Sequence, residues 1–268
     1  MLTFIGLGLY DKTDISIKGF QAIQKADIVY LENYTSKLMG SSKKELEEYY
    51  NKKIILLSRN DVELNFKKIL DKAKTKNVVF LTPGDTMIST THINLKINAI
   101  KKNIDTNLIY GSSIHTAICS ISGLQNYKFG KSTSISFPYV SNKKKRIISD
   151  YPYDTIIKNY KNNLHTLVYL DLNTEKERFM TVKEALEILL EIANKKSDKL
   201  IPNLLAIGIS QVGSKNENIK LDFIKNFNNF NIGPPLQILI IPGKLHIIEV
   251  EALHEFTKTP ISLLNMYT

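Results

Sequence analysis

The sequence predicts an α/β protein made of two α/β domains. Three observations lead to this prediction. Short apolar segments rich in β-branched residues alternate with segments of helical periodicity. The apolar segments are hydrophobic on both faces, which is typical of a parallel sheet covered by helices on two sides. The alternation breaks between residues 138 and 163 and then resumes, and 268 residues suit one large or two smaller domains.

The first half of the chain alternates regularly up to about residue 130. Strands are expected at 2–9, 27–32, 53–58, 77–82 and 107–111. Helices are expected at 15–25, 43–50, 61–75 and 90–102. In the third of these, apolar residues recur at helical spacing: Val62, Phe66, Ile69, Leu70 and Ala73.

The segment 138–163 carries prolines and charges without a steady period, which indicates a connection between domains. The expected division is therefore 1–137, a connection at 138–163, and 164–268. The last part is a smaller α/β unit with longer strands. Its expected elements are strands at 165–172, 204–213 and 236–243, a helix at 181–194 and a final helix from about 247.

Composition indicates a folded protein of the cytosol. Hydrophobic residues make up 43% of the chain, enough for a substantial core. Cys119 is the single cysteine, so no disulfide framework is possible, and the apolar start lacks the basic segment of a signal peptide. No apolar run approaches the roughly 20 residues that span a bilayer.

The net charge of +10 raises the question of nucleic-acid binding. Arginine, the side chain that grips phosphates and bases in bidentate fashion, occurs only at Arg59, Arg146 and Arg178. The lysines are spread over all the expected helices. Solvated helix faces explain them better than a basic binding patch, although such a patch stays an alternative. The one dense basic cluster, 142–146, is expected in a loop.

The segment GLGLYD follows the first expected strand, where a dinucleotide fingerprint would lie. Gly6 and Gly8 are followed by Asp11, so the third glycine of that fingerprint is missing. This argues against a nicotinamide cofactor. The remaining interpretation is a glycine turn, which lets a ligand or another backbone approach closely.

The sequence gives little indication of a metal site or of a catalytic nucleophile. The five histidines contain no pair at ligand spacing within one helix. His115 and Cys119 lie four residues apart, but two residues make no site, and Cys119 has the surroundings of a small buried hydrophobe. We expect no metal and no catalytic nucleophile.

Polar residues follow three expected strands, at Gly84-Asp85, Ser112-Ser113-Ile114 and Asp171-Leu172. Each could be a turn or N-cap residue, which is the simpler explanation for any one of them. Ligands of open parallel sheets gather outside the carboxyl ends of the strands. Three such ends together favour a small-molecule cleft.

Several longer blocks carry a family resemblance: FIGLGLYDKTDISIKGFQAIQKADIVYLENYTS (4–36), TPGDTMISTTH (82–92), SSIHTAICSISGLQNYKFGKSTSI (112–135), LHTLVYLDL (164–172) and GPPLQILIIPGKLHIIEVEAL (233–253). In this order they resemble the diphthine synthases, methyltransferases of the tetrapyrrole-methylase fold group. The YTS, GLQxYKFG and HTLxxLD blocks are specific to the family, whereas GLGL and GD occur more widely in the fold group.

The resemblance implies a cytoplasmic homodimer that binds S-adenosylmethionine in a cleft between its two α/β domains and uses no metal. It implies methylation of the amino group of the 3-amino-3-carboxypropyl-histidine of translation elongation factor 2, a step towards diphthamide. The partner is then a protein, and neither nucleic acid nor membrane is expected. A tetrapyrrole or other small-molecule methyltransferase of this fold is the alternative, and a catalytically silent RNA-binding protein is a second rival.

The resemblance also implies a set of cofactor contacts and no catalytic residue of the chain's own. The implied contacts are Leu9, Asp85, Ile88, Ser113, Ile114, Leu172, Val212 and Gln237. Three departures from the family pattern stand out: Thr86 for the proline after Gly-Asp, Ser210-Gln211 for Ala-Arg, and Gln237 for a histidine. An amide at 237 can still donate a hydrogen bond, but it cannot titrate near neutral pH.

Overall fold

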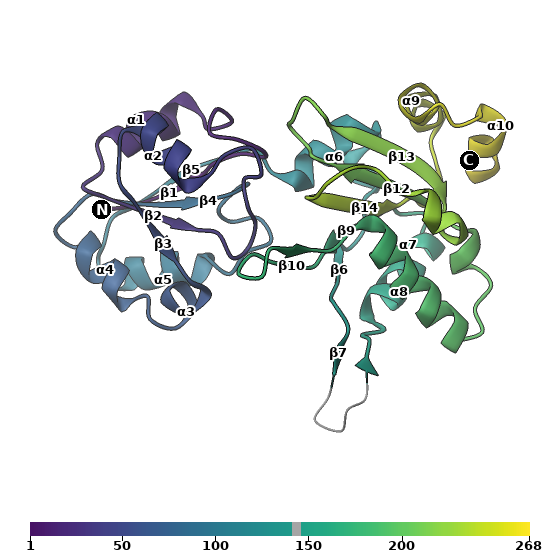
Figure 1. Ribbon diagram of the computed structural model, residues 1–268, viewed down its shortest axis with the longest axis horizontal. Helices are drawn as coiled ribbons and strands as arrows, with labels where there is room; N and C mark the ends of the chain where they lie inside the picture. Colours follow the sequence, from purple (N-terminus) through teal and green to yellow (C-terminus); the bar gives the residue numbers. More distant parts are fainter. Residues whose placement is uncertain (141–145) are drawn as a thin grey trace. The chain divides into compact units, whose positions relative to one another are not determined.

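The computed structural model describes residues 1–140 and 146–268 (Figure 1). The chain forms two compact units. Unit 1 comprises Met1–Ile114 and Asn173–Glu177, and unit 2 comprises His115–Leu172 and Arg178–Thr268. Residues 142–145 of the basic cluster expected in a loop lie outside the described residues.

Unit 1 is built on a five-stranded sheet in which every pairing is parallel. Its strand order is β3-β2-β4-β1-β5. The strands are β1 (Leu2–Gly6), β2 (Ile28–Glu32), β3 (Ile54–Leu57), β4 (Val78–Thr82) and β5 (Thr106–Ile109). All residues of β1 and β4 are buried, because both faces of these central strands are covered. The parallel sheet expected from the sequence is confirmed.

Helices cover both faces of this sheet (Figure 1). One buried cluster joins the sheet to α1 (Ile17–Gln24) and α2 (Lys43–Tyr50). The other joins it to α3 (Arg59–Glu63), α4 (Lys67–Ala73) and α5 (Ile93–Lys101). The chain runs from β1 to β2 on one side of the β1–β4 pair and from β4 to β5 on the other. This reversal places a topological switch point at the carboxyl ends of β1 and β4, where ligands bind in open α/β sheets.

Unit 2 contains a second five-stranded sheet, of order β13-β12-β14-β9-β6. It is mixed: β6 and β9 pair in parallel, and the other described pairs are antiparallel. Its strands are β6 (Thr133–Ile135), β9 (Thr166–Leu170), β12 (Leu205–Ser210), β13 (Asn218–Phe223) and β14 (Gln237–Ile241). Its helices are α6 (Ile114–Ser122), α7 (Tyr151–Lys161), α8 (Val182–Lys195), α9 (Ile247–Thr257) and α10 (Ile261–Leu264).

Two short hairpins and four 3₁₀ turns complete the described elements. The hairpins are β7 (Tyr139–Val140) with β8 (Arg146–Ile147), and β10 (Leu172–Asn173) with β11 (Arg178–Phe179). The 3₁₀ turns are η1 (Asn126–Lys128), η2 (Ile201–Asn203), η3 (Ile224–Asn229) and η4 (Asn265–Tyr267). None of the helices formed by residues 1–140 and 146–268 has the length and apolar character needed to cross a bilayer.

The division of the chain differs from the one expected at 137 and 164. Unit 2 already begins at His115, and the segment expected as a connection contributes α7 to its core. Tyr153 and Ile156 of α7 pack into the cluster that α8 dominates. The buried face of α7 also includes Pro152 and Asn159, so its apolar period is hard to see in the sequence.

Candidate functional site

The loops that follow β1 and β4 are joined at the switch point of unit 1. The backbone N–H of Gly8 donates to the carbonyl of Gly84 at 3.2 Å, and the N–H of Gly84 donates to the carbonyl of Gly8 at 2.6 Å. The N–H of Leu7 donates to the carbonyl of Thr82 at 2.9 Å. The GLGL and PGD segments therefore form one backbone structure.

Glycine is required where these loops meet the loop after β5. A Cβ atom on Gly6 would lie 2.6 Å from the carbonyl oxygen of Gly84, and one on Gly111 would lie 2.4 Å from the same atom. Such distances are far below van der Waals contact. The absence of a side chain at Gly6 and Gly111 thus lets the ends of β1 and β5 lie directly against the backbone of Gly84.

Gly84 also presents bare backbone to open space. Its φ is +78°, and a Cβ placed on it would find no atom within 4 Å. A ligand can therefore approach the main chain of Gly84 from the side on which a Cβ atom would stand. This open backbone fits a small organic cofactor such as S-adenosylmethionine.

Asp85 ties the β4 loop to the β5 loop. Its side chain is 7% exposed. Oδ1 accepts the backbone N–H of Met87 at 2.9 Å, and Oδ2 accepts that of Gly111 at 3.1 Å. A carboxylate oxygen has two lone pairs, so each oxygen can still accept a hydroxyl or amine of a ligand.

Leu9 lies in a turn that is held by a carboxylate. Oδ2 of Asp14 accepts the backbone N–H groups of Leu9 (3.1 Å), Tyr10 (2.6 Å) and Asp11 (3.3 Å). A carboxylate occupies the place where a dinucleotide fingerprint would present its N–H groups to a pyrophosphate. The structure thereby supports the sequence argument against a dinucleotide, and it leaves Leu9 half-buried.

The other contacts expected in unit 1 lie on the same three loops. Ile88, in the loop after β4, is 42% exposed and offers an apolar surface. Ser113 is 7% exposed and follows Gly111 by two positions, and Ile114 is the first residue of α6. The structure therefore brings Leu9, Asp85 and Ser113 onto loops that are hydrogen-bonded or packed to one another.

The three contacts expected in unit 2 lie at strand ends. Leu172 begins β10, and half-buried Val212 follows β12. Gln237, at the start of β14, has its amide engaged within the unit: Oε1 accepts the N–H of Val182 at 2.7 Å, and Nε2 donates to the carbonyl of Gly233 at 2.6 Å. Gln237 thus links β14 to the start of α8.

Cys119, half-buried in α6, has no feature of a nucleophile. Burial raises the pKa of its thiol, which is the opposite of what a reactive thiolate needs. Among residues 1–140 and 146–268, no three His, Cys, Asp or Glu side chains are grouped so that they could hold a metal ion.

A buried polar cluster beneath the β4 loop was missed in the sequence. It consists of Glu32 at the end of β2, Tyr34 and Thr35 just after it, and His92 at the start of α5. Glu32 and His92 are both 0% exposed. Oε2 of Glu32 accepts the backbone N–H groups of Tyr34 and Thr35, each at 3.1 Å, and Oε1 accepts the hydroxyl of Thr35. The one feature of the sequence that could have indicated this cluster is the glutamate that ends the otherwise apolar strand IVYLE.

His92 connects this cluster to the backbone of the GD loop. Its Nδ1 lies 2.9 Å from the carbonyl oxygen of Thr86, and its Nε2 lies 3.3 Å from the hydroxyl of Tyr34 and 3.8 Å from Oε1 of Glu32. Burial lowers the pKa of His92 to about 4. Burial raises the pKa of Glu32 to about 7, against the opposing effect of its hydrogen bonds from Thr35 and Tyr34.

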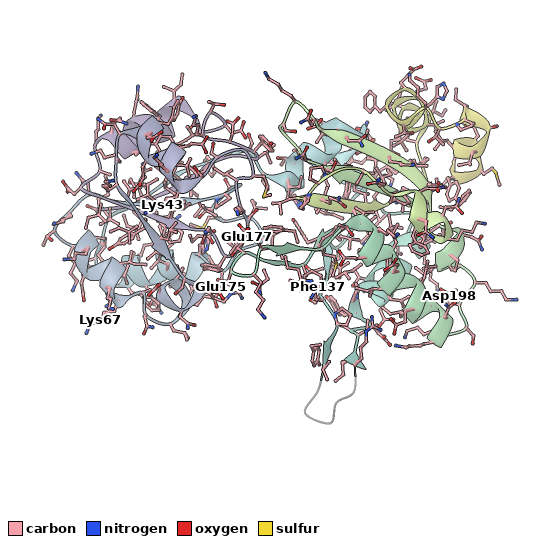
Figure 2. The ribbon with its side chains drawn as sticks, viewed as in Figure 1. Lys43, Lys67, Phe137, Glu175, Glu177 and Asp198 are labelled. Atoms are coloured by element: carbon pink, nitrogen blue, oxygen red, sulfur yellow. The ribbon has the colours of Figure 1, made fainter. Side chains whose placement is uncertain are left out.

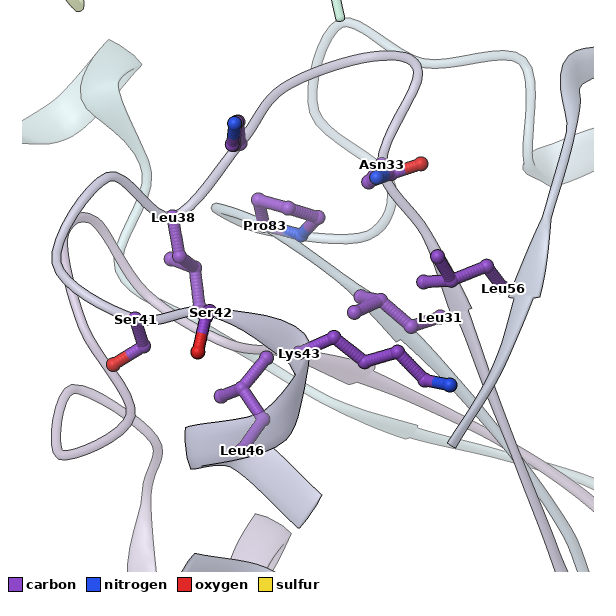
Figure 3. Close-up of a pocket in the computed structure, with 10 residues that line it drawn as sticks. Leu31, Asn33, Leu38, Ser41, Ser42, Lys43, Leu46, Leu56 and Pro83 are labelled. Carbon is purple, nitrogen blue, oxygen red and sulfur yellow. The ribbon is translucent and has the colours of Figure 1, made fainter. Parts of the chain in front are cut away.

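A small pocket of about 80 Å³ lies beside the same loop (Figure 3). Leu31, Leu38, Leu46, Leu56 and Pro83 give it apolar walls, and it is also lined by Asn33, Lys37, Ser41, Ser42 and Lys43. Both lysines are paired within unit 1, Lys37 with Glu177 and Lys43 with Glu47. Pro83 directly precedes Gly84, so one wall of the pocket belongs to the loop that carries Asp85.

Comparison with known proteins agrees with this geometry. The family model of the tetrapyrrole (corrin/porphyrin) methylases matches residues 1–226. A diphthine synthase from Methanosarcina barkeri is 52% identical over 264 residues, covering 98% of each chain. One from Methanosarcina acetivorans is 49% identical, covering 97% of each chain.

The chain belongs to the diphthine synthase family.

A crystal structure of a diphthine synthase matches the whole chain and 99% of its own length, with a TM-score of 0.89 at 40% identity. The resemblance found in the sequence and the expected fold class are thereby confirmed.

The diphthine synthase blocks of unit 2 converge on one buried carboxylate, Glu249. Its Oε1 accepts the N–H of Gln125 (2.8 Å) and Nε2–H of His165 (3.0 Å). Its Oε2 accepts Nζ–H of Lys128 (2.8 Å) and the N–H of His246 (2.7 Å). The GLQNYKFG, LHTL and PGKLH segments therefore meet at Glu249, and their shared role in the structure is to hold unit 2 together.

Proposed function

We propose that this protein transfers methyl groups from S-adenosylmethionine to the amino nitrogen of the 3-amino-3-carboxypropyl-histidine of translation elongation factor 2. The proposal rests on full-length similarity to diphthine synthases together with the open backbone of Gly84 at the switch point of unit 1. S-adenosylmethionine, when bound, supplies an activated methyl group on a sulfonium. The chain then needs neither a nucleophile nor a metal of its own.

In this proposal, the residues of the chain bind the cofactor and orient its methyl group. Leu9 and Ile88 offer apolar surface for a methyl cradle, and Asp85 keeps two acceptor sites for hydroxyl or amine groups of the cofactor. In well-aligned systems, orientation of the reacting groups lowers the activation free energy by roughly 7–11 kcal/mol. The attacking amine has to be unprotonated, so Asp85 serves best when it faces the cofactor and not the amine.

Further contacts are proposed on the family pattern. These are Ser113 and Ile114 in unit 1, and Leu172, Val212 and Gln237 in unit 2. The amide of Gln237 already makes two hydrogen bonds inside unit 2, so a contact there uses its remaining N–H or lone pair.

We propose a cytoplasmic homodimer as the working state, with the lysine-rich surface docking an acidic face of the elongation factor. Lys43 on α2 and Lys67 on α4 are examples of exposed lysines in unit 1 (Figure 2). Complementary charge speeds encounter, and salt screens it. The short chain, which is poor in insertions, favours a product that stops at the trimethylated amine.

Mass spectrometry tests the proposed function. Elongation factor 2 carrying the 3-amino-3-carboxypropyl-histidine is incubated with the protein and with S-adenosylmethionine labelled at the methyl group. The expected result is mass gained in labelled methyl increments on the peptide with the modified histidine, up to three. Unmodified elongation factor is the control. Methylation of a tetrapyrrole with none on the elongation factor would overturn the proposal in favour of the small-molecule alternative.

A further inference from the structure

The proposed chemistry gives no role to the buried cluster of Glu32, Tyr34, Thr35 and His92. The hydrogen bonds of this cluster determine which nitrogen of His92 carries the proton. A carbonyl oxygen can only accept, so the 2.9 Å contact with Thr86 requires that Nδ1 of His92 carries the proton. A neutral imidazole then has a lone pair on Nε2, which accepts the hydroxyl of Tyr34 at 3.3 Å. The geometry thus selects the Nδ1–H tautomer.

The charged groups around His92 are compatible with a neutral ring. Glu32 faces it from β2 at 3.8 Å. Glu63 of α3 is held by the hydroxyl of Thr91 at 3.0 Å and acts on His92 from a distance. The guanidinium of Arg59 lies 5.2 Å from the ring centre of Tyr34. Burial outweighs the hydrogen bond to the Thr86 carbonyl and the charge of Glu63, and it lowers the pKa of His92 to about 4, so the ring stays neutral near pH 7.

Thr86 is the residue that follows Asp85, and its carbonyl is a main anchor of the loop. It accepts Nδ1–H of His92 at 2.9 Å and the hydroxyl of Thr90 at 2.6 Å. The loop also passes through two positive-φ residues, Gly84 at +78° and Ser89 at +58°. The peptide that this carbonyl belongs to also carries the N–H of Met87, which donates to Oδ1 of Asp85 at 2.9 Å. Fixing the Thr86–Met87 peptide therefore fixes the direction of the Asp85 carboxylate.

We infer that His92, held by Tyr34 and Glu32, is a positioning residue that sets the Asp85 loop for cofactor binding. The inference rests on the proposed use of S-adenosylmethionine. His92 acts through the carbonyl of Thr86 and does not itself take part in methyl transfer. It therefore governs the affinity for the cofactor and leaves the maximal rate unchanged.

Three variants at position 92 test this assignment. In His92→Asn the amide nitrogen can occupy the place of Nδ1 and still donate to Thr86, whereas His92→Gln carries its amide near the place of Nε2. His92→Leu removes the donor and stays apolar. By titration calorimetry with S-adenosylhomocysteine we expect affinity within about threefold of wild type for His92→Asn and a loss of about tenfold for His92→Leu. We expect His92→Gln to resemble His92→Leu.

Kinetics and spectroscopy separate positioning from a loss of stability. At saturating cofactor, kcat of His92→Leu is expected within twofold of wild type while KM for the cofactor rises. Ile69→Ala, a core variant on the buried face of α4, is the control that lowers stability without touching the loop. Nitrogen-15 spectra of the side chain should show His92 as the neutral Nδ1–H tautomer at pH 7, and His165, whose Nδ1 accepts from Gly243, as the Nε2–H tautomer.

The outcomes are distinct. If wild type fails to bind S-adenosylhomocysteine, the proposed function itself fails. If wild type binds and His92→Leu binds equally well, the positioning role is overturned. A charged His92 at pH 7, or equal losses in His92→Asn and His92→Leu at matched stability, would overturn it as well.

Discussion

Gly8 and Gly84 exchange two backbone hydrogen bonds, although 75 residues lie between them in the chain. The N–H of Gly8 donates to the carbonyl of Gly84 at 3.2 Å, and the N–H of Gly84 donates to the carbonyl of Gly8 at 2.6 Å. This bridge extends the pairing of β1 and β4 past the ends of both strands. The loops proposed to bind the cofactor are thereby continuous with the sheet of unit 1.

Asp85 is expected to decide cofactor affinity. Asp85→Ala removes both the acceptors that a ligand can use and the two bonds to the N–H groups of Met87 and Gly111. We expect S-adenosylmethionine to bind at least about tenfold more weakly, since bonds to a charged group contribute roughly 1.5–3 kcal/mol. Isothermal titration measures it, with Asp85→Asn as the partial variant. Equal binding by wild type and Asp85→Ala would show that the role given to Asp85 is wrong.

Two glycine variants should separate ligand access from folding. Gly84→Ala places its methyl group in open space, so it carries only the cost of positive φ, about 1 kcal/mol, and the protein folds. Gly111→Ala drives a methyl group to 2.4 Å from the Gly84 carbonyl and should lower the melting temperature far more. We expect Gly84→Ala to bind the cofactor poorly although it is folded. Unimpaired binding by this variant would remove the argument for ligand approach at Gly84.

Thr86 should be a site where a simple substitution stabilises. Its hydroxyl is buried and, among the described residues, has no hydrogen-bond partner. Thr86→Val keeps the shape and removes the unsatisfied group, which should raise the free energy of unfolding by about 1 kcal/mol. Thr90→Val is the matched control, because the Thr90 hydroxyl donates to the Thr86 carbonyl and its loss should destabilise. Urea unfolding of both variants checks the difference in sign.

Glu249 should make unit 2 sensitive to acid. Burial alone would raise the pKa of its carboxyl, but hydrogen bonds from His165, Lys128 and two backbone N–H groups outweigh burial and lower it to about 2. A depressed pKa contributes stability above the unfolded value of 4.5, and this contribution is lost as the pH falls from about 4.5 to about 2. Its size is roughly 3 kcal/mol at neutral pH.

Unfolding of wild type and Glu249→Gln from pH 7 to pH 3 measures this contribution. The wild type should lose its advantage over the variant as the pH falls, whereas Glu251→Gln, at an exposed position of α9, should follow the wild type. A difference between wild type and Glu249→Gln that does not change with pH would contradict the assignment.

Unit 1 was predictable because its strands are apolar on both faces. β1 and β4 are buried throughout, and such runs between helical segments leave few alternatives. The expected helix 61–75 is divided into α3 and α4, since the chain leaves the helix at Leu64 and Asn65 and the N–H of Asn65 returns to the carbonyl of Asn60. An apolar period alone does not show such a break.

Unit 2 was less predictable. β13 reads NIKLDF, with a single buried residue, because it is an edge strand of its sheet, and its charges concealed it. The strand-end residues Gly84 and Asp85 could be singled out from the sequence, and the candidate site is built around their loop. The cluster at His92 could not be found in this way, since Tyr34 and His92 are 58 positions apart and only the parallel order of β2 and β4 brings them together.

The assignment of Asn173–Glu177 to unit 1 has a consequence for biosynthesis. This segment is flanked on both sides in the chain by residues of unit 2. During synthesis on the ribosome, unit 1 therefore cannot be completed until His115–Leu172 has emerged, because its last segment, Asn173–Glu177, follows those residues. No single cut of the chain therefore separates the two units with unit 1 complete, because residues 173–177 would stay with unit 2.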